Sequence, residues 1–368
     1  MSRVGLVMIV KDEEAVIERA LQSAKTFIST YVIVDTGSTD STKEIIQRVL
    51  ADISGKILDR PWVSFGHNRS EALALCDGHM DWMIMMDADD SLAGAVPSTD
   101  IWTSDATKNI DGFMIRLKHG TLEHQRTQIF RTGIGWAYEG VVHEYPICKS
   151  KGVATVGILP SDTYMITRCE GARSKDPEKY LKDAYMLETA LLQNPTDHRT
   201  LFYLAQSYRD AGQRELARRY YQRNLELSGG WDQERYMTMV NLINLVDSQE
   251  EKLRLTWAAI ELCPDRLEAP YTYLNQRRTL QLPHTQQSYA IASIVRNRTT
   301  SPMNLFTLPA IYEWGMDDEL AVTAFATKRY RECYDASMRC VLRAPEAQMR
   351  ENAMSNAKAA DKHLSHIA

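Results

Sequence analysis

The sequence lacks several patterns that would place it in a familiar class of proteins. Its N-terminal apolar stretch, residues 4–10, is too short for a signal or membrane segment and ends in charged residues. Its six cysteines include no CxxC pair, which excludes the usual zinc patterns and a secreted disulfide framework. We therefore expect reduced cysteines and a cytoplasmic location. Neither GxGxxG nor the P-loop pattern GxxxxGKS/T occurs, which weighs against a dinucleotide-binding fold and a P-loop.

An excess of positive charge is also missing. The net charge of −5 argues against a general binder of nucleic acid or anionic membranes, although a local basic pocket for phosphates remains compatible with it. The apolar content of 44% and the charged content of 25% are typical of a soluble globular protein. A chain of 368 residues has room for two or three domains.

The first half of the chain alternates between strand and helix patterns. Apolar runs predict strands, and apolar residues at helical spacing predict helices between them. We expect strands over 4–10, 31–34, 56–58 and 82–86, and helices over 13–25, 39–50 and 68–75. This order predicts a parallel sheet between layers of helices. Shorter strands with glycines between residues 112 and 157 predict an antiparallel extension.

The second half is helical from about Pro177 onward. Pro195, Gly229-Gly230 and Pro264 fall about 34 residues apart, the period of tetratricopeptide repeats. One unit carries the large and small residues of that pattern: Leu201, Leu204, Ala205, Tyr208, Gly212, Ala217 and Tyr221. Small Ala205 and Ala217 allow two antiparallel helices to approach closely, and residues 318–345 are expected to form another pair. Ordinary packed helices are the alternative explanation.

Three carboxylates follow the buried strand that ends at Met86. The negative charges of Asp87, Asp89 and Asp90 would repel one another, and a bound Mg²⁺ or Mn²⁺ usually compensates such repulsion. Ligands of α/β sheets bind at the carboxyl ends of strands, so the cluster lies where chemistry is expected. An acidic turn that caps a following helix is the alternative.

The strand that ends at Asp35 is followed by Thr36-Gly37-Ser38-Thr39-Asp40. Gly37 permits a tight turn, and Ser38 and Asp40 can cap the next helix. Capping does not explain Asp35, whose carboxylate lies at a strand end beside the exposed backbone of Gly37. This carboxylate can accept a hydrogen bond from a nucleobase ring nitrogen.

These segments together resemble family-two glycosyltransferases of the GT-A fold. The resemblance is carried by five motifs in the family's order: Val10-Lys-Asp-Glu-Glu14, Asp35-Thr-Gly-Ser-Thr-Asp-Ser-Thr42, Phe65-Gly-His-Asn-Arg-Ser70, Asp87-Ala-Asp-Asp90 and Trp136-Ala-Tyr-Glu-Gly-Val-Val-His-Glu144. The last motif resembles that of members with a C-terminal tetratricopeptide region. It implies an α/β GT-A nucleotide-sugar-binding domain with a mostly parallel, Rossmann-like sheet over residues 1–170. An all-α domain of tetratricopeptide-like helical repeats would follow over residues 171–368.

The resemblance also implies roles for individual residues. The residue matching Asp35 binds the uracil of a UDP-sugar in that family, and the residue matching Arg69 lies near the nucleotide. Asp87 and Asp89 match the DxD pair, with Asp87 assigned to the nucleotide and Asp89 to Mn²⁺ or Mg²⁺ on the diphosphate. Apart from the resemblance, Arg173 and Ser174 of the linker could close over the diphosphate.

His143 and Glu144 are candidates for completing the site. The His143 imidazole could join Asp89 on the metal, while Glu144 could act as the general base that deprotonates the acceptor. Adjacent side chains of a strand point to opposite faces, so both roles require an irregular backbone. Glu139 and Asp90 are rival bases, and a buried, hydrogen-bonded histidine is the alternative explanation for His143.

We therefore expect a metal-dependent, inverting glycosyltransferase, of the hexosyltransferase type, that uses a UDP-sugar donor. The helical repeats would bind the acceptor, a protein, peptide or glycan, or a second subunit. A different possibility is a catalytically weak or inactive domain that mounts a protein-binding scaffold, but intact Asp35, Asp87, Asp89 and His143 argue against decay. A nucleotidyltransferase would instead need a basic, glycine-rich loop after the first strand.

Overall fold

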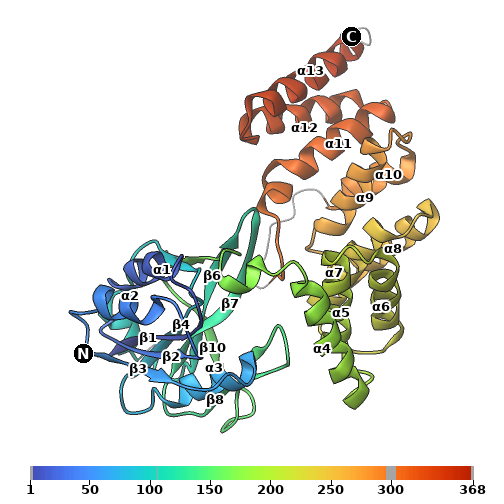
Figure 1. The fold of residues 1–368 in the computed structure, drawn as a ribbon. Coiled ribbons are helices and arrows are strands. Elements are labelled where there is room, and N and C mark those ends of the chain that lie inside the picture. Colours follow the sequence, from blue (N-terminus) through green and yellow to red (C-terminus); the bar gives the residue numbers. More distant parts are fainter. Residues whose placement is uncertain (1–2, 106, 296–303, 366–368) are drawn as a thin grey trace. The chain divides into compact units, whose positions relative to one another are not determined.

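The computed structural model describes residues 3–105, 107–295 and 304–365, except for the side chains of residues 174, 175 and 295. The chain forms two compact units, Met1–Gly120 with His124–Pro195, and Thr121–Glu123 with Thr196–Ala368. Figure 1 shows the sheet in the N-terminal part and helices in the C-terminal part. The predicted domain boundary between residues 170 and 171 stays a prediction.

The first unit contains a nine-stranded mixed sheet with the order β3-β2-β1-β4-β7-β6-β11-β5, and β10 pairs with β6. Its strands are β1 (Val4–Val10), β2 (Thr30–Asp35), β3 (Gly55–Asp59), β4 (Trp82–Met85), β5 (Ser91–Ala93), β6 (Gly112–His119), β7 (Leu122–Arg131), β10 (Val156–Ile158) and β11 (Tyr164–Ile166). β1 runs parallel to β2 and β4, and β2 runs parallel to β3. The α/β fold class is confirmed.

The predicted antiparallel extension is mixed in its strand directions. β7 is antiparallel to β4 and β11 is antiparallel to β5, whereas β10 and β11 run parallel to β6. A separate two-stranded antiparallel hairpin consists of β8 (Trp136–Glu139) and β9 (Tyr145–Cys148). This hairpin carries the last of the sequence motifs.

Helices cover both faces of the parallel strands because alternate strand residues point to opposite sides. Leu6, Met8 and Ile33 pack in one cluster with the apolar residues of α1 (Ile17–Ala24) and α2 (Thr42–Val49). Val7 and Val34 pack in a second cluster with residues of α3 (Phe65–Ala74). These two cores hold β1, β2 and β4 in register, so their carboxyl ends meet at one edge of the sheet.

The second unit is built of helices, as predicted. Its helices are α5 (His198–Asp210), α6 (Arg214–Glu226), α7 (Asp232–Leu245), α8 (Gln249–Leu262), α9 (Glu268–Thr279), α10 (Gln286–Val295), α11 (Met316–Ala326), α12 (Tyr330–Arg343) and α13 (Ala347–Leu364). α4 (Lys179–Gln193) belongs to the first unit. In the pair α5 and α6, Ala205, Ala217 and Tyr221 are fully buried, as the tetratricopeptide pattern predicts. Residues 318–345 form the expected second pair, α11 and α12.

No helix among these described residues combines the length and the apolar character needed to cross a membrane.

One buried carboxylate in α11 makes the stability of the chain dependent on pH. Burial raises the pKa of Glu319 from 4.5 to about 7. The positive charge of Arg278, whose Nη2 lies 3.0 Å from Glu319 Oε1, acts to lower this pKa. The folded chain binds this proton more tightly than the unfolded chain does. The free energy of unfolding therefore falls as the pH rises from 4.5 through about 7.

We expect Glu319→Gln to remove this dependence. The variant should be more stable than the wild type by up to about 3 kcal/mol near pH 8, and the gain should shrink near pH 5. Urea unfolding at both pH values measures it, with the exposed Asp335→Asn on α12 as a control. An equal gain at both pH values would contradict the assignment.

Candidate functional site

The loops that follow β1 and β2 are hydrogen-bonded to each other at the carboxyl edge of the sheet. Asp12 Oδ1 accepts a hydrogen bond from the Thr39 backbone N–H at 2.7 Å, and Ser38 Oγ accepts one from the Asp12 N–H at 3.0 Å. Glu14 Oε2 accepts from the Ser41 N–H at 3.1 Å. Asp12 has a φ of +54°, a conformation that Asp and Asn adopt more readily than other non-glycine residues. Most polar residues of these two motifs therefore have a structural role.

Asp35 ends β2 with a fully buried side chain. Its Oδ1 accepts hydrogen bonds from the backbone N–H groups of Gly37 and Ser38, at 2.9 and 2.8 Å. Gly37 has a φ of +106°, which favours glycine. The second oxygen, Oδ2, is buried and has no hydrogen-bond partner within the described part of the chain. A buried acceptor left unpaired costs free energy, so this oxygen suits a donor supplied by a ligand.

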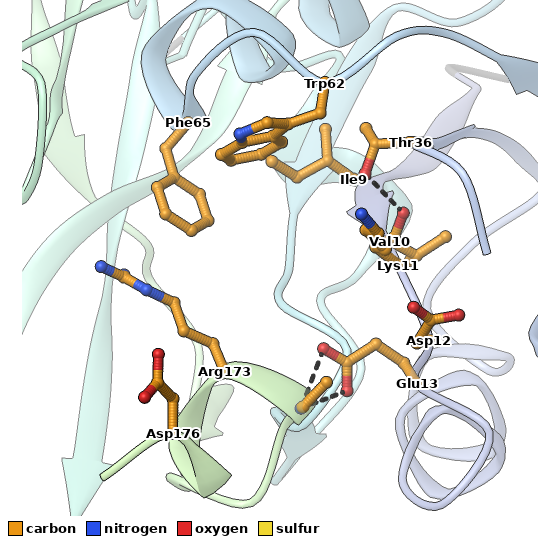
Figure 2. Close-up of a pocket in the computed structure, with 11 residues that line it drawn as sticks. Ile9, Val10, Lys11, Asp12, Glu13, Thr36, Trp62, Phe65, Arg173 and Asp176 are labelled. Carbon is orange, nitrogen blue, oxygen red and sulfur yellow. Dashed lines mark hydrogen bonds between the residues drawn. The ribbon is translucent and has the colours of Figure 1, made fainter. Parts of the chain in front are cut away.

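A pocket of about 420 Å³ opens at the same edge of the first unit (Figure 2). It is lined by residues 9–13 at the end of β1, by Thr36 and by the aromatic residues Trp62 and Phe65. The two aromatic rings meet edge to face, with centroids 4.7 Å apart. Sequence reasoning missed Trp62, because it lies in an irregular loop without periodicity. Thr36, the residue after Asp35, lines this pocket, and the two aromatic faces are suited to a planar ligand.

The segment after β11 forms the other side of this pocket. Arg173 lies over the Phe65 ring, with Cζ 4.7 Å from the centroid, and pairs with Asp183 of α4. Glu13 accepts hydrogen bonds from the Ala172 backbone N–H, as the dashed lines in Figure 2 show. Arg173 thus lines the pocket, whereas the side chain of Ser174 lies outside the described residues.

Arg69 of α3 connects two of the predicted site carboxylates. Its Nη2 pairs with Asp87 Oδ1 and its Nη1 with Glu144 Oε1. The side chain of Asp87 is 35% exposed, whereas those of Arg69 and Glu144 are only 11% and 5% exposed. Burial alone would raise the pKa of Asp87, but the charges of Arg69 and Arg126 hold it below its usual value. Asp87 is therefore ionised and held in place.

Asp90 differs sharply from Asp87. It is almost fully buried, and neither carboxyl oxygen has a hydrogen-bond partner among the residues that the structure describes. Burial and the charge of Asp87 raise the pKa of Asp90 to about 8, although Arg126 acts in the opposite direction. The sequence did not indicate that Arg126 of β7 belongs to this site. The extension of the antiparallel register from Ile84 and Ile129 would place it opposite Asp87.

Asp89 and His143 lie in different surroundings. Asp89 Oδ2 accepts the backbone N–H groups of Glu170 and Gly171, both at 3.0 Å, and so anchors the segment that lines the pocket. His143 is exposed and has a φ of +54°, the irregular backbone on which its predicted role depends. Within the ranges that the structure describes, no three His, Cys, Asp or Glu side chains gather as a metal site.

The third candidate base, Glu139, ends β8 and is exposed. Its Oε2 accepts a hydrogen bond of 2.9 Å from the Tyr145 hydroxyl. The structure thus brings Arg69, Asp87 and Glu144 into contact and leaves Glu139 exposed. Asp35 lies at the end of β2, which β1 separates from β4.

Residues 6–95 match the model of the family described as Glycosyl transferase family 2. The chain is 32% identical over 93 residues to an uncharacterized glycosyltransferase of Rickettsia felis, a match that covers 25% of this chain and 31% of that protein. It is 36% identical over 93 residues to a TPR repeat-containing protein of Synechococcus elongatus, covering 25% and 22%. These matches confirm the resemblance to family-two glycosyltransferases.

The matched segment spans less than a third of the length of either relative. Among solved structures, the chain is similar to S. aureus TarS in complex with UDP at a TM-score of 0.38 and 13% identity, covering 88% of this chain and 91% of that one.

Proposed function

We propose that this chain is a metal-dependent glycosyltransferase that moves a sugar from a UDP-sugar to an acceptor with inversion at the anomeric carbon. The observation that carries the proposal is the buried, unpartnered Oδ2 of Asp35 at the carboxyl end of β2. The N3–H group of uracil is a donor that this oxygen can accept. Cytosine has an acceptor at the same ring position, so the carboxylate discriminates between the two bases.

The neighbouring pocket supports the same proposal. Trp62 and Phe65 offer aromatic faces to the base or ribose, and Arg173 supplies a positive charge for the diphosphate. The pocket has a volume of about 420 Å³, which lies within the range of small-molecule binding sites.

The chemistry of the carboxylates after β4 supports the proposed divalent cation. Asp87 and Asp89 supply hard oxygen donors, and Mg²⁺ is usually held by one or two carboxylates together with substrate phosphates. Asp89 would hold Mg²⁺ or Mn²⁺, with Asp87 beside it on the nucleotide. When bound, the cation neutralises the charge that develops on the departing diphosphate. His143 is proposed as a further ligand from the irregular turn between β8 and β9.

The reaction that these residues would support is a single displacement. The acceptor oxygen attacks the anomeric carbon on the face opposite the diphosphate, while the bond from that carbon to the diphosphate breaks. The bonding electrons leave with UDP, and the acceptor proton passes to a carboxylate of the site. The helical second unit is proposed to bind the acceptor, a protein, peptide or glycan.

Binding of free nucleotides tests this proposal. In the presence of Mn²⁺, UDP should bind at least about tenfold more tightly than CDP, ADP or GDP, because cytosine presents an acceptor at its N3 position and the purines are larger than the single ring of uracil. Isothermal titration calorimetry with the four diphosphates measures the difference. Equal affinities, or no binding of UDP at millimolar concentration, would favour a scaffold function instead.

A further inference from the structure

Glu144 lies in the turn between β8 and β9, and this hairpin is packed tightly against α3. Ser70 Oγ of α3 accepts a hydrogen bond of 2.9 Å from the Tyr138 backbone N–H. Gly66 lies so close to the hairpin that an added Cβ would stand 3.0 Å from the carbonyl oxygen of Gly140. These contacts fix the position of the hairpin, and with it Glu144, relative to α3.

The guanidinium of Arg69 is enclosed on several sides. Phe65 and Tyr138 place their rings 5.8 Å from its Cζ, and its two terminal nitrogens are taken by Glu144 and Asp87. The guanidinium fork is planar and rigid, so an anchor at Nη1 determines where Nη2 lies. Glu144 thereby sets the orientation in which Arg69 meets Asp87.

We propose that Glu144 is a positioning residue for the donor site and does not accept the proton of the acceptor. This inference rests on the proposed function, because it assigns Asp87 to the nucleotide. A general base must come within hydrogen-bond reach of an acceptor hydroxyl. The Glu144 side chain is only 5% exposed and holds Arg69, whereas Asp87 is 35% exposed. By the same criterion Asp90, which is almost fully buried, cannot reach an acceptor hydroxyl, so the proton passes to the exposed Glu139.

Two substitutions at one position separate the two roles. The side chain oxygen in Glu144→Gln still accepts a hydrogen bond from Arg69 Nη1, but an amide cannot take a proton from the acceptor. Glu144→Ala removes both abilities and leaves Arg69 buried without one of its partners. A positioning residue is therefore rescued by glutamine, and a general base is not.

Steady-state kinetics with a UDP-sugar and Mn²⁺ gives the test. We expect Glu144→Gln to keep kcat and the donor KM within about tenfold of wild type. Glu144→Ala should lose about a hundredfold or more in kcat/KM, largely through a higher donor KM. Glu71→Gln is the matched control: this residue of α3 forms a similar pair with Arg60 at 2.8 Å outside the site, so its kinetics should not change.

The opposite pattern would overturn the inference. If Glu144→Gln lowers kcat about a hundredfold or more with an unchanged donor KM, Glu144 is the general base. Thermal unfolding of each variant shows whether a lost activity reflects a lost fold, and the isosteric glutamine variant carries the decision if the alanine variant unfolds. A wild-type chain that turns over no UDP-sugar overturns the proposed function and this inference together.

Discussion

Asp35→Asn is expected to weaken UDP binding by about a hundredfold or more, while the fold stays intact. An asparagine has only one side-chain oxygen. If that oxygen accepts the Gly37 and Ser38 N–H groups, the amide nitrogen takes the place of Oδ2 and opposes the uracil N3–H donor. If the amide is flipped, the nitrogen opposes the two backbone donors instead. Both orientations place donor against donor.

The same substitution should also change base preference. An amide N–H in place of Oδ2 complements the N3 acceptor of cytosine, so the preference for UDP over CDP should shrink or reverse. Calorimetry with both nucleotides measures it. Asp59→Asn is the control, since Asp59 is the register neighbour of Asp35 on β3, has a 77% exposed side chain and pairs with Lys43. An unchanged preference in Asp35→Asn would rule out contact with the base.

Asp89→Asn is expected to lower the turnover of UDP-sugar by about a thousandfold. The amide oxygen can still accept the N–H groups of Glu170 and Gly171, so the segment that lines the pocket stays anchored. The variant loses the negative charge that would hold the cation on the diphosphate. Turnover should therefore fall while thermal stability changes little.

Release of UDP at increasing Mn²⁺ concentration measures this effect, and high Mn²⁺ should restore part of the lost rate. Asp81→Asn is the control, because Asp81 precedes the same strand at its amino end and binds the Arg3 N–H at 2.7 Å. Asp89→Ala should lose both the charge and the anchor of the segment. Wild-type turnover that persists in Asp89→Asn, or in EDTA, would exclude the role in metal binding.

The sequence predicted the strand ends well because local patterns determine them. The apolar runs of β1, β2 and β4 are continuous, and their alternation with helices implies a parallel order. That order alone brings Asp35 and Asp87 to one edge of the sheet, as the structure has them. The helical pair around Ala205 and Tyr221 was predicted for the same reason, since its spacing is local.

Contacts between distant segments could not be predicted in this way. Arg69 and Glu144 are 75 residues apart, and their pairing depends on the packing of a hairpin against α3. Asp89 meets backbone groups 81 and 82 residues later in the chain. A motif gives the residue types at these positions but not their partners, which tertiary packing decides.

The most direct test of the account is the release of UDP from individual UDP-sugars by the wild-type chain in the presence of Mn²⁺. We expect at least one UDP-sugar to be hydrolysed slowly without an acceptor, because water can replace the acceptor hydroxyl at the anomeric carbon. This activity should be lost in Asp89→Asn and in EDTA. If no UDP-sugar is hydrolysed or bound at millimolar concentration, the chain is not a UDP-sugar glycosyltransferase.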